Sequence, residues 1–267
     1  MRILFVADVV GRPGRKVLKA FVEAFRGTLR WDLLVANGEN AAGGFGITEG
    51  VFEDLLSLGV DVVTSGNHVW DRKEVLELIS REERFLRPAN FPPGAPGNGF
   101  VVLERLGLKV GVLNLQGRVY MSPLDCPFRV ADEILAGELS DADVVVVDFH
   151  AEATSEKKAL GLYLDGRVSA VLGTHTHVMT RDETILPGGT AFMTDVGMTG
   201  GHDGIIGMRK ETVLDRFLLG MPTRMDVCEE GLRFNGVLLE VDGLSGRATS
   251  IKALNLGIEE IERGVIP

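Results

Sequence analysis

Side chains that can bind metals recur at the ends of apolar segments in this 267-residue sequence. Asn67 stands beside His68 directly after such a segment, and His175 is separated from His177 by one residue. Carboxylate, imidazole and amide groups without a thiolate suit hard or borderline cations such as Mn, Fe or Zn, and are unlike a structural zinc site. The five positions are Asp8, Glu39 with Asn40, Asn67 with His68, His150, and His175 with His177.

The charge of this set indicates which chemistry it favours. Asp8 and Glu39 bring two negative charges, so two divalent cations would leave a net charge of about plus two. A phosphate oxygen and an activated water fit that excess charge, whereas a peptide carbonyl would be polarised without neutralising it. A cation pair about 3.5–4 Å apart, bridged by a carboxylate such as Glu39, is typical of phosphatases and nucleases.

The elements that must position these residues are buried strands alternating with helices. Gly11-Arg12-Pro13-Gly14 predicts a tight loop after the first strand. Since ligands bind outside the carboxyl ends of strands in open α/β sheets, the five positions are expected to converge. The predicted strands are 2–7, 33–36, 61–64, 144–147 and 169–172, and the predicted amphipathic helices are 15–26, 48–58, 128–138 and 155–163.

Two other regions depart from this alternation. Residues 100–104 and 109–115 predict a hairpin, and the tail segments 185–194, 232–241 and 247–254 predict strands of a second, mostly antiparallel sheet. The sequence contains no internal repeat, low-complexity tract or linker. We therefore expect an α/β protein with two sheets in one domain, residues 1–267.

Composition limits the partners and the compartment. The net charge of −10 argues against a broad nucleic-acid surface, although a bound cation would still admit a small phosphate substrate. No run approaches the about 18 apolar residues of a membrane helix. Cys126 and Cys228 are expected to be reduced thiols in a cytoplasmic enzyme. The proline-rich segment 87–98 is a candidate surface for a homo-oligomer.

The order of the motifs resembles the calcineurin-like metallophosphoesterases, whose blocks are D-x-H, G-D, G-N-H-[DE], a lone His and G-H-x-H. Gly66-Asn67-His68, His150 and His175-Thr176-His177 correspond to the last three blocks. The first block reads Asp8-Val9-Val10 and lacks its second ligand, and the second reads Gly38-Glu39-Asn40, with Glu in place of Asp.

Both departures resemble the bacterial YmdB-like branch, and the similarity runs through nearly the whole chain. Two further motifs carry it, Asn37-Gly38-Glu39-Asn40-Ala41-Ala42-Gly43-Gly44 and Thr194-Asp195-Val196-Gly197-Met198-Thr199-Gly200. The resemblance implies a four-layer α/β/β/α sandwich of two mixed sheets. It also implies two divalent metal ions, Fe or Mn first, with Zn or Mg as alternatives.

The same resemblance implies a role for each residue. Glu39 would bridge the two metals, and His68 would protonate the leaving group after attack by a metal-bridging hydroxide on a cyclic nucleotide, notably a 2′,3′-cyclic one. Asn40 would stand in for the missing histidine of the first block. One metal would be bound by Asp8, Glu39, Asn40 and His177, and the other by Glu39, Asn67, His150 and His175.

Three alternatives stay open: a phosphomonoesterase, a nuclease acting on RNA, and a metal-containing regulatory protein with little turnover. The proton donor His68 argues against the last, because a binding module does not need it. Arg12, Arg118 and His202 are candidate substrate contacts from loops, and each is equally a candidate for a solvated surface residue. Asp195 is expected to orient a metal-binding histidine.

Overall fold

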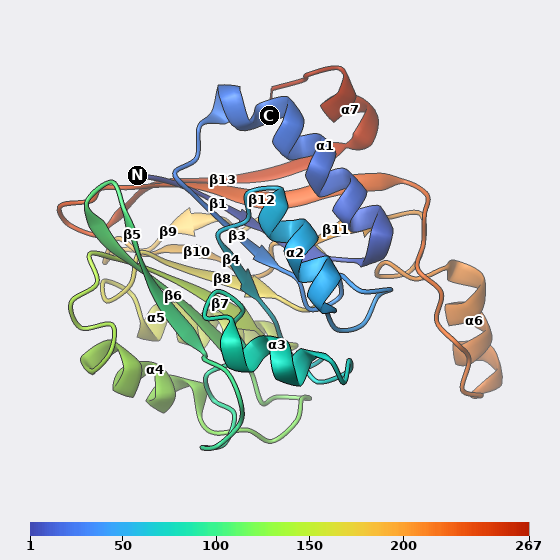
Figure 1. Ribbon diagram of the computed structural model, residues 1–267, viewed down its shortest axis with the longest axis horizontal. Helices are drawn as coiled ribbons and strands as arrows, with labels where there is room; N and C mark the ends of the chain where they lie inside the picture. Colours follow the sequence, from blue (N-terminus) through green and yellow to red (C-terminus); the bar gives the residue numbers. More distant parts are fainter. Residues whose placement is uncertain (267) are drawn as a thin grey trace.

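Two β-sheets packed face to face, with helices on both outer faces, form the body of the protein (Figure 1). The computed structural model describes residues 1–266. The first sheet contains β1 (Arg2–Val6), β2 (Asp8–Val9), β3 (Leu33–Asn37), β4 (Val62–Thr64), β11 (Met198–Gly201), β12 (Leu232–Val241) and β13 (Ala248–Gly257). The second contains β5 (Phe100–Arg105), β6 (Leu108–Gln116), β7 (Val144–His150), β8 (Ala170–Thr174), β9 (Thr184–Ile185) and β10 (Ala191–Met193).

Both sheets are mixed. The strand order is β2-β11-β12-β1-β3-β4 in the first sheet, with β13 beside β12, and β5-β6-β7-β8-β10-β9 in the second. Strand β3 runs parallel to β1 and to β4, whereas β12 is antiparallel to β1. Strands β6, β7, β8 and β10 are parallel neighbours.

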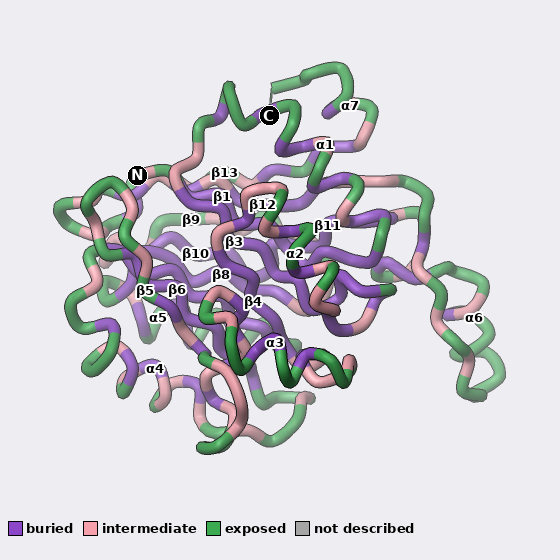
Figure 2. The backbone as a smooth tube through the Cα atoms, in the orientation of Figure 1, coloured by how far each residue is buried: buried purple, intermediate pink, exposed green. Residues whose placement is uncertain are grey.

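The helices cover the outer faces of the two sheets, which completes the expected four-layer α/β/β/α sandwich (Figure 1). The first sheet carries α1 (Gly11–Leu29), α2 (Glu49–Ser57), α3 (Val75–Arg81) and α7 (Ile258–Glu262). The second carries α4 (Pro127–Ala136) and α5 (Thr154–Tyr163). Helix α6 (Lys210–Leu219) stands apart from the sheets, and most of its residues are exposed (Figures 1 and 2). Within residues 1–266 there is no helix with the length and apolarity needed to span a bilayer.

Alternation along each strand builds the layers of the core. Successive side chains of a strand point to opposite faces, so Leu4 and Val6 of β1 pack under the helices while Ile3 and Phe5 pack between the sheets. Helix α1 covers its sheet with an apolar stripe that includes Phe21, whose ring stacks on Phe234 of β12. Burial on both faces explains why the central strands read as continuous apolar runs.

The layer between the sheets changes from apolar to polar toward the carboxyl ends of the parallel strands. On β7, Val144 and Val146 belong to the apolar core, and the next inward-facing residues are Asp148 and His150, both fully buried. The same change occurs on the neighbouring strands. Their buried polar residues are Asn37, Thr64, Asn114, Gln116 and Thr174. Asn37, Thr64 and Thr174 all donate hydrogen bonds to Asp148, whereas the Gln116 side chain and Asn114 Oδ1 have no partner among the described residues.

The tail differs from the expectation of a second, mostly antiparallel sheet. Strands β12 and β13 belong to the first sheet, and the second sheet is mostly parallel. The predicted strand 185–194 is divided into β9 and β10 by a turn in which the Gly189 amide donates to the Leu186 carbonyl. Alternation marks a strand that buries one face, but it does not identify the strand's neighbours.

The predicted loop at residues 11–14 is the first turn of α1. Pro13 is compatible with this position, because the first amides of a helix have no partner within it. A Cβ atom at Gly14 would lie 2.3 Å from the Thr199 carbonyl oxygen, so glycine lets α1 approach β11 closely.

Candidate functional site

The five positions singled out in the sequence lie together at the carboxyl ends of strands from both sheets. This follows from the topology, because the parallel strands of each sheet end at the same edge. The first sheet supplies Asp8 on β2, Glu39 and Asn40 after β3, and Asn67 and His68 after β4. The second supplies His150 at the end of β7, and His175 and His177 after β8.

Four of these side chains converge on one point. The His150 Nε2 atom lies 3.0 Å from Glu39 Oε1, 3.0 Å from Asn67 Oδ1 and 3.0 Å from His175 Nδ1. Donors about 2.1 Å from a cation, at right angles to each other, would themselves be about 3.0 Å apart. The four side chains therefore fit a divalent cation.

A second group adjoins the first and shares Glu39 with it. The Asn40 amide lies 3.1 Å from His177 Nε2 and 3.2 Å from Glu39 Oε1. A 180° rotation of the Asn40 amide would place its oxygen, instead of its nitrogen, beside His177 Nε2. Asp8 is fully buried, and its Oδ1 atom has no hydrogen-bond partner among the described residues. A buried carboxylate oxygen without a partner is expected where a cation binds.

The missing ligand of the first block has an apolar replacement. Val10 is fully buried and packs against the chain at Gly207, where an added Cβ would lie 3.0 Å from Val10 Cγ1. Val10 therefore offers nothing to a cation, and the polar atom facing His177 comes from Asn40.

Charges within the buried group shift several pKa values. Burial raises the pKa of Asp8 to about 6. Burial also disfavours the charged form of Glu39, but the charge of His150 outweighs it and lowers the Glu39 pKa to about 2. The reciprocal effect of Glu39 outweighs the burial of His150 and raises the His150 pKa to about 9. Burial and the charge of His150 lower the pKa of His175 to about 3. Without a cation, the positive charge beside Glu39 therefore resides on His150.

A buried chain of hydrogen bonds orients the His150 ring. The Thr174 hydroxyl donates its proton to Asp148 Oδ1 at 2.7 Å, so the Thr174 Oγ1 atom can accept from His150 Nδ1 at 2.9 Å. Proton donation from Nδ1 keeps the lone pair of the neutral ring on Nε2, which faces the convergence point.

The other two histidines have their own partners. His177 Nδ1 donates to the Ile206 carbonyl at 2.9 Å, which leaves Nε2 free toward Asn40. His175 Nε2 pairs with Glu152 Oε2 at 3.1 Å and so leaves Nδ1 facing His150. Each ring thus presents one defined nitrogen to the site.

Hydrogen bonds to Asp195 fix the turn that carries His175 and His177. The backbone φ is 101° at His175 and 63° at His177, a region that non-glycine residues adopt at a cost of order 1–3 kcal/mol each. Thr176, between them, donates to Asp195 from its amide at 3.1 Å and from its hydroxyl at 2.7 Å. Asp195 also pairs with buried Lys157 at 2.6 Å. Asp195 thus acts on the histidines through Thr176.

His68 is placed differently from the converging residues. It lines a cavity of about 370 Å³ together with Glu39, Asn40, His175 and His177. Its Nδ1 lies 2.8 Å from Asp71 Oδ2, an arrangement that fixes the ring and leaves Nε2 for another partner. Such a histidine can transfer a proton to a molecule in the cavity.

Comparison with known proteins identifies the family. Residues 4–254 match the model of the YmdB-like protein family. The chain belongs to the YmdB-like family. The 2′,3′-cyclic-nucleotide 2′-phosphodiesterase of Bacillus subtilis is 48% identical over 254 residues, which cover 95% of this chain and 96% of that protein.

Solved structures agree with the YmdB-like assignment. A hypothetical protein from Thermus thermophilus has a TM-score of 0.91 at 47% identity, covering 96% of this chain and 99% of that one. A novel phosphatase from Mycoplasma pneumoniae has a TM-score of 0.91 at 33% identity, covering 96% and 93%. A 5′-nucleotidase precursor from Thermus thermophilus shares the fold, with a TM-score of 0.58 at 14% identity over 99% of this chain and 57% of that one.

The three residues considered as substrate contacts have other neighbours in this YmdB-like chain. Arg12 lines a separate cavity with Lys16, Arg118 donates to Cys126 Sγ at 3.4 Å, and His202 Nε2 lies 3.1 Å from the Met198 carbonyl. Within residues 1–266, none of the three lines the cavity that contains His68.

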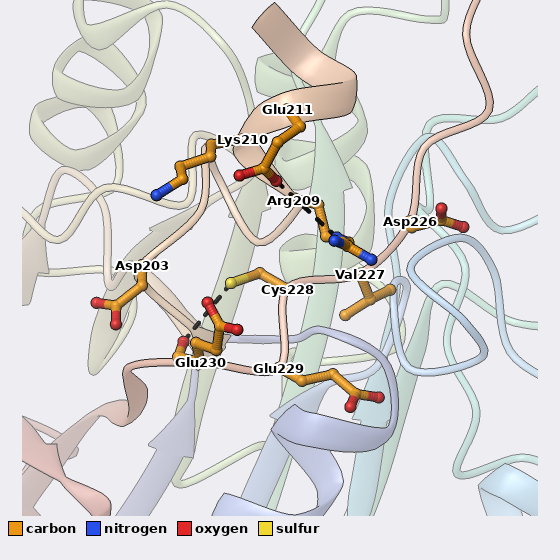
Figure 3. Close-up of a pocket in the computed structure, with 9 residues that line it drawn as sticks. All are labelled: Asp203, Arg209, Lys210, Glu211, Asp226, Val227, Cys228, Glu229 and Glu230. Atoms are coloured by element: carbon orange, nitrogen blue, oxygen red, sulfur yellow. Dashed lines mark hydrogen bonds and ion pairs between the residues drawn. The ribbon is translucent and has the colours of Figure 1, made fainter.

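A larger cavity, of about 530 Å³, lies at the base of α6 (Figure 3). Charged side chains dominate its lining, among them Asp203, Arg209 and Glu230. None of the converging residues of the YmdB-like site is among the described residues that line it. This cavity therefore contributes nothing to the candidate site.

Sequence reasoning missed several supporting residues. Asp148 precedes His150 by two positions on the same strand face, and Asp71 follows His68 by three, so local spacing could have indicated both. Lys157 and Glu152 offered no such signal, because their partners, Asp195 and His175, are distant from them in the sequence.

Proposed function

We propose that this chain is a metal-dependent phosphodiesterase that hydrolyses small cyclic nucleotides, 2′,3′-cyclic ones in particular. The observation that carries the proposal is the convergence of Glu39, Asn67, His150 and His175 at spacings of 3.0 Å beside a cavity lined by His68. The 48% identity to a 2′,3′-cyclic-nucleotide 2′-phosphodiesterase supports the choice of substrate.

The proposal includes two divalent cations, Fe or Mn first, with Zn or Mg as alternatives. When bound, such cations supply an activated water and stabilise negative charge on phosphoryl oxygens. Glu39 is the shared ligand, since its Oε1 lies close to both His150 and Asn40. One set of ligands is Glu39, Asn67, His150 and His175, and the other is Asp8, Glu39, Asn40 and His177.

His68 is the proton donor in this proposal. An alkoxide leaving group has too high a pKa to depart unassisted, and a positioned acid contributes about 10²- to 10⁴-fold to such a step. Asp71 holds Nδ1, so Nε2 is the atom that passes its proton to the leaving oxygen. Asn67, the adjacent residue, faces His150 instead and contributes its amide oxygen.

A substrate panel tests the reaction class. We expect elemental analysis of anaerobically purified protein to find about two metal ions per chain. We expect 2′,3′-cyclic AMP to be hydrolysed faster than 3′,5′-cyclic AMP, a phosphomonoester or single-stranded RNA. Glu39→Gln should lose both metal and turnover, and the matched control Glu53→Gln, on the exposed face of α2, should lose neither.

Other outcomes would favour the alternatives. Faster turnover of the phosphomonoester or of RNA would indicate a phosphatase or a nuclease. Tight binding of a phosphodiester by metal-loaded protein without turnover would indicate a regulatory role. The proposal places a single-domain enzyme in the cytoplasm, in keeping with the unpaired state of Cys126 and Cys228.

A further inference from the structure

The cavity beside the candidate metal centre has two chemically different halves. One half consists of Glu39, Asn40, His68, His175 and His177. Arg216 is the single charged residue among the other described residues that line the cavity. The remaining lining residues are apolar or glycine: Gly44, Phe45, Ile206, Met208, Val213, Phe217 and Met225.

The apolar half is attached directly to the metal-binding half. The Ile206 carbonyl accepts the hydrogen bond of His177 Nδ1 at 2.9 Å. A Cβ atom added to Gly44 would lie 2.9 Å from Met208 Cε, so the glycine-rich loop packs tightly against the segment that carries Ile206 and Met208. A molecule bound at the histidines is therefore adjacent to these apolar groups.

Phe45 is held at the junction of the two halves. Arg72 donates from Nε to the Phe45 carbonyl at 3.0 Å and from Nη2 to the Ala42 carbonyl, which fixes the loop. The Phe45 ring lies edge-on to His68, with ring centroids 5.1 Å apart. An aromatic ring, half-buried, thus stands beside the proposed proton donor.

Another part of the cavity wall comes from α6. Val213 is buried, whereas Phe217, one turn later, is 79% exposed although it lines the cavity. An exposed phenylalanine contributes little to folding, and its apolar ring can instead serve a ligand. Helix α6 does not pack on either sheet, since it stands apart from both (Figure 1).

We propose that the apolar half is a nucleobase subsite in which Phe45 and Phe217 contact the faces of the base. This inference rests on the proposed phosphodiesterase function, which puts the phosphate at the histidines. The base is the apolar, planar part of a nucleotide, and aromatic rings bind it by stacking, worth about 1–3 kcal/mol per base. A volume of about 370 Å³ accommodates a base and a ribose.

The lining also determines how selective the subsite is. Apart from Arg216, the described side chains of the apolar half carry no hydrogen-bonding group that could read the edge of a base. Stacking on aromatic rings accepts all four bases and favours the purines, because their rings are larger. We expect kcat/KM values for the four 2′,3′-cyclic nucleotides to lie within about tenfold of each other, purines first.

Two substrates and matched variants test the subsite in the metal-loaded, full-length protein. The substrates are 2′,3′-cyclic AMP and methyl ribofuranoside 2,3-cyclic phosphate, which lacks a base. The quantity compared is kcat/KM for the nucleotide divided by kcat/KM for the base-less ester. We expect Phe45→Ala and Phe217→Ala each to lower this ratio about tenfold. Phe217→Trp should restore it. The control is Leu218→Ala, also on α6 and 78% exposed, which is not among the cavity residues and should leave the ratio unchanged.

A binding measurement separates this inference from the proposed function. We expect calorimetry to show that adenosine 3′-phosphate binds wild-type protein about tenfold tighter than ribose 3-phosphate, and that Phe217→Ala removes this preference. If neither ester is hydrolysed, the proposed function fails and the binding preference decides the subsite. Equal losses on both esters, or equal binding of both phosphates, would overturn the subsite.

Discussion

Asn67 and His68 are adjacent in the chain, yet their side chains face different surroundings. The Asn67 oxygen lies 3.0 Å from His150 Nε2, whereas the His68 ring lines the cavity and pairs with Asp71. The His68 amide donates to Glu39 Oε2 at 3.2 Å, so the backbone of this turn is tied to the shared carboxylate. Removal of the His68 ring should therefore affect proton transfer and leave the converging ligands in place.

The leaving group of the substrate tests this separation. We expect His68→Ala to lower kcat on 2′,3′-cyclic AMP by about 10²- to 10⁴-fold, because the alkoxide then departs without a proton. On bis(p-nitrophenyl) phosphate the loss should be less than about tenfold, since nitrophenolate needs no such help. Metal content, measured by elemental analysis, should match wild type. Loss of metal in this variant would show that His68 is a ligand and not the proton donor.

At the scale of the element, the turn after β8 shows how the fold positions two ligands at once. Both histidines have positive φ, and the residue between them is bonded twice to Asp195. Asp195 is in turn paired with Lys157 from α5, and both side chains are buried. A buried ion pair is weak evidence for added stability, so we expect Lys157 and Asp195 to act mainly by fixing the turn.

Substitutions at Thr176 separate positioning from stability. We expect Thr176→Val to weaken the binding of Mn²⁺ about tenfold, because the turn loses the hydroxyl bond that holds both histidines. Thr176→Ser keeps that bond and should bind Mn²⁺ like wild type. Thr190→Val removes a buried hydroxyl bond elsewhere, to the Val168 carbonyl, and should reduce thermal stability without changing Mn²⁺ affinity. Equal affinities in Thr176→Val and wild type would limit the network to a structural role.

The elements also show what the sequence could and could not predict. Buried strands followed by polar residues are local patterns, so the five strand ends and their convergence could be predicted. The position of β12 beside β1 could not, because its pattern fits either sheet. Helix α6 was not predicted, although Val213, Leu214, Phe217 and Leu218 recur at helical spacing. The sequence carries no signal for the direction in which the side chains of Arg12, Arg118 and His202 point, so their positions could not be predicted.

At the scale of the whole molecule, the candidate ligands join the two sheets at one edge. Glu39 and Asn67 come from the first sheet, and His150 and His175 come from the second. Elsewhere the sheets are held together by an apolar core. A cation at this edge would link elements far apart in the sequence, so its binding would stabilise the folded protein as a whole.

The pH determines how large this stabilisation is. In the metal-free protein the His150 pKa is raised to about 9, so the pair with Glu39 stabilises the fold fully below pH 6.5 and is lost as the pH rises through 9. A cation requires His150 to be neutral, and its uptake near pH 7.5 should release about one proton. Glu39 and His175, with pKa values of about 2 and 3, need release none at that pH. Metal affinity should thus rise about tenfold per pH unit up to pH 9.

The gap in melting temperature between metal-loaded and metal-free protein should widen accordingly. One proton corresponds to about 1.4 kcal/mol per pH unit, so the gap should grow by about 5 °C or more between pH 7 and pH 9. Scanning calorimetry with Mn²⁺ under nitrogen, or with a chelator, measures it at each pH. Calorimetric titrations in buffers of different ionisation enthalpy count the released proton directly. A gap that stays constant with pH, together with no proton release, would mean that His150 is already neutral at pH 7 or does not bind the cation.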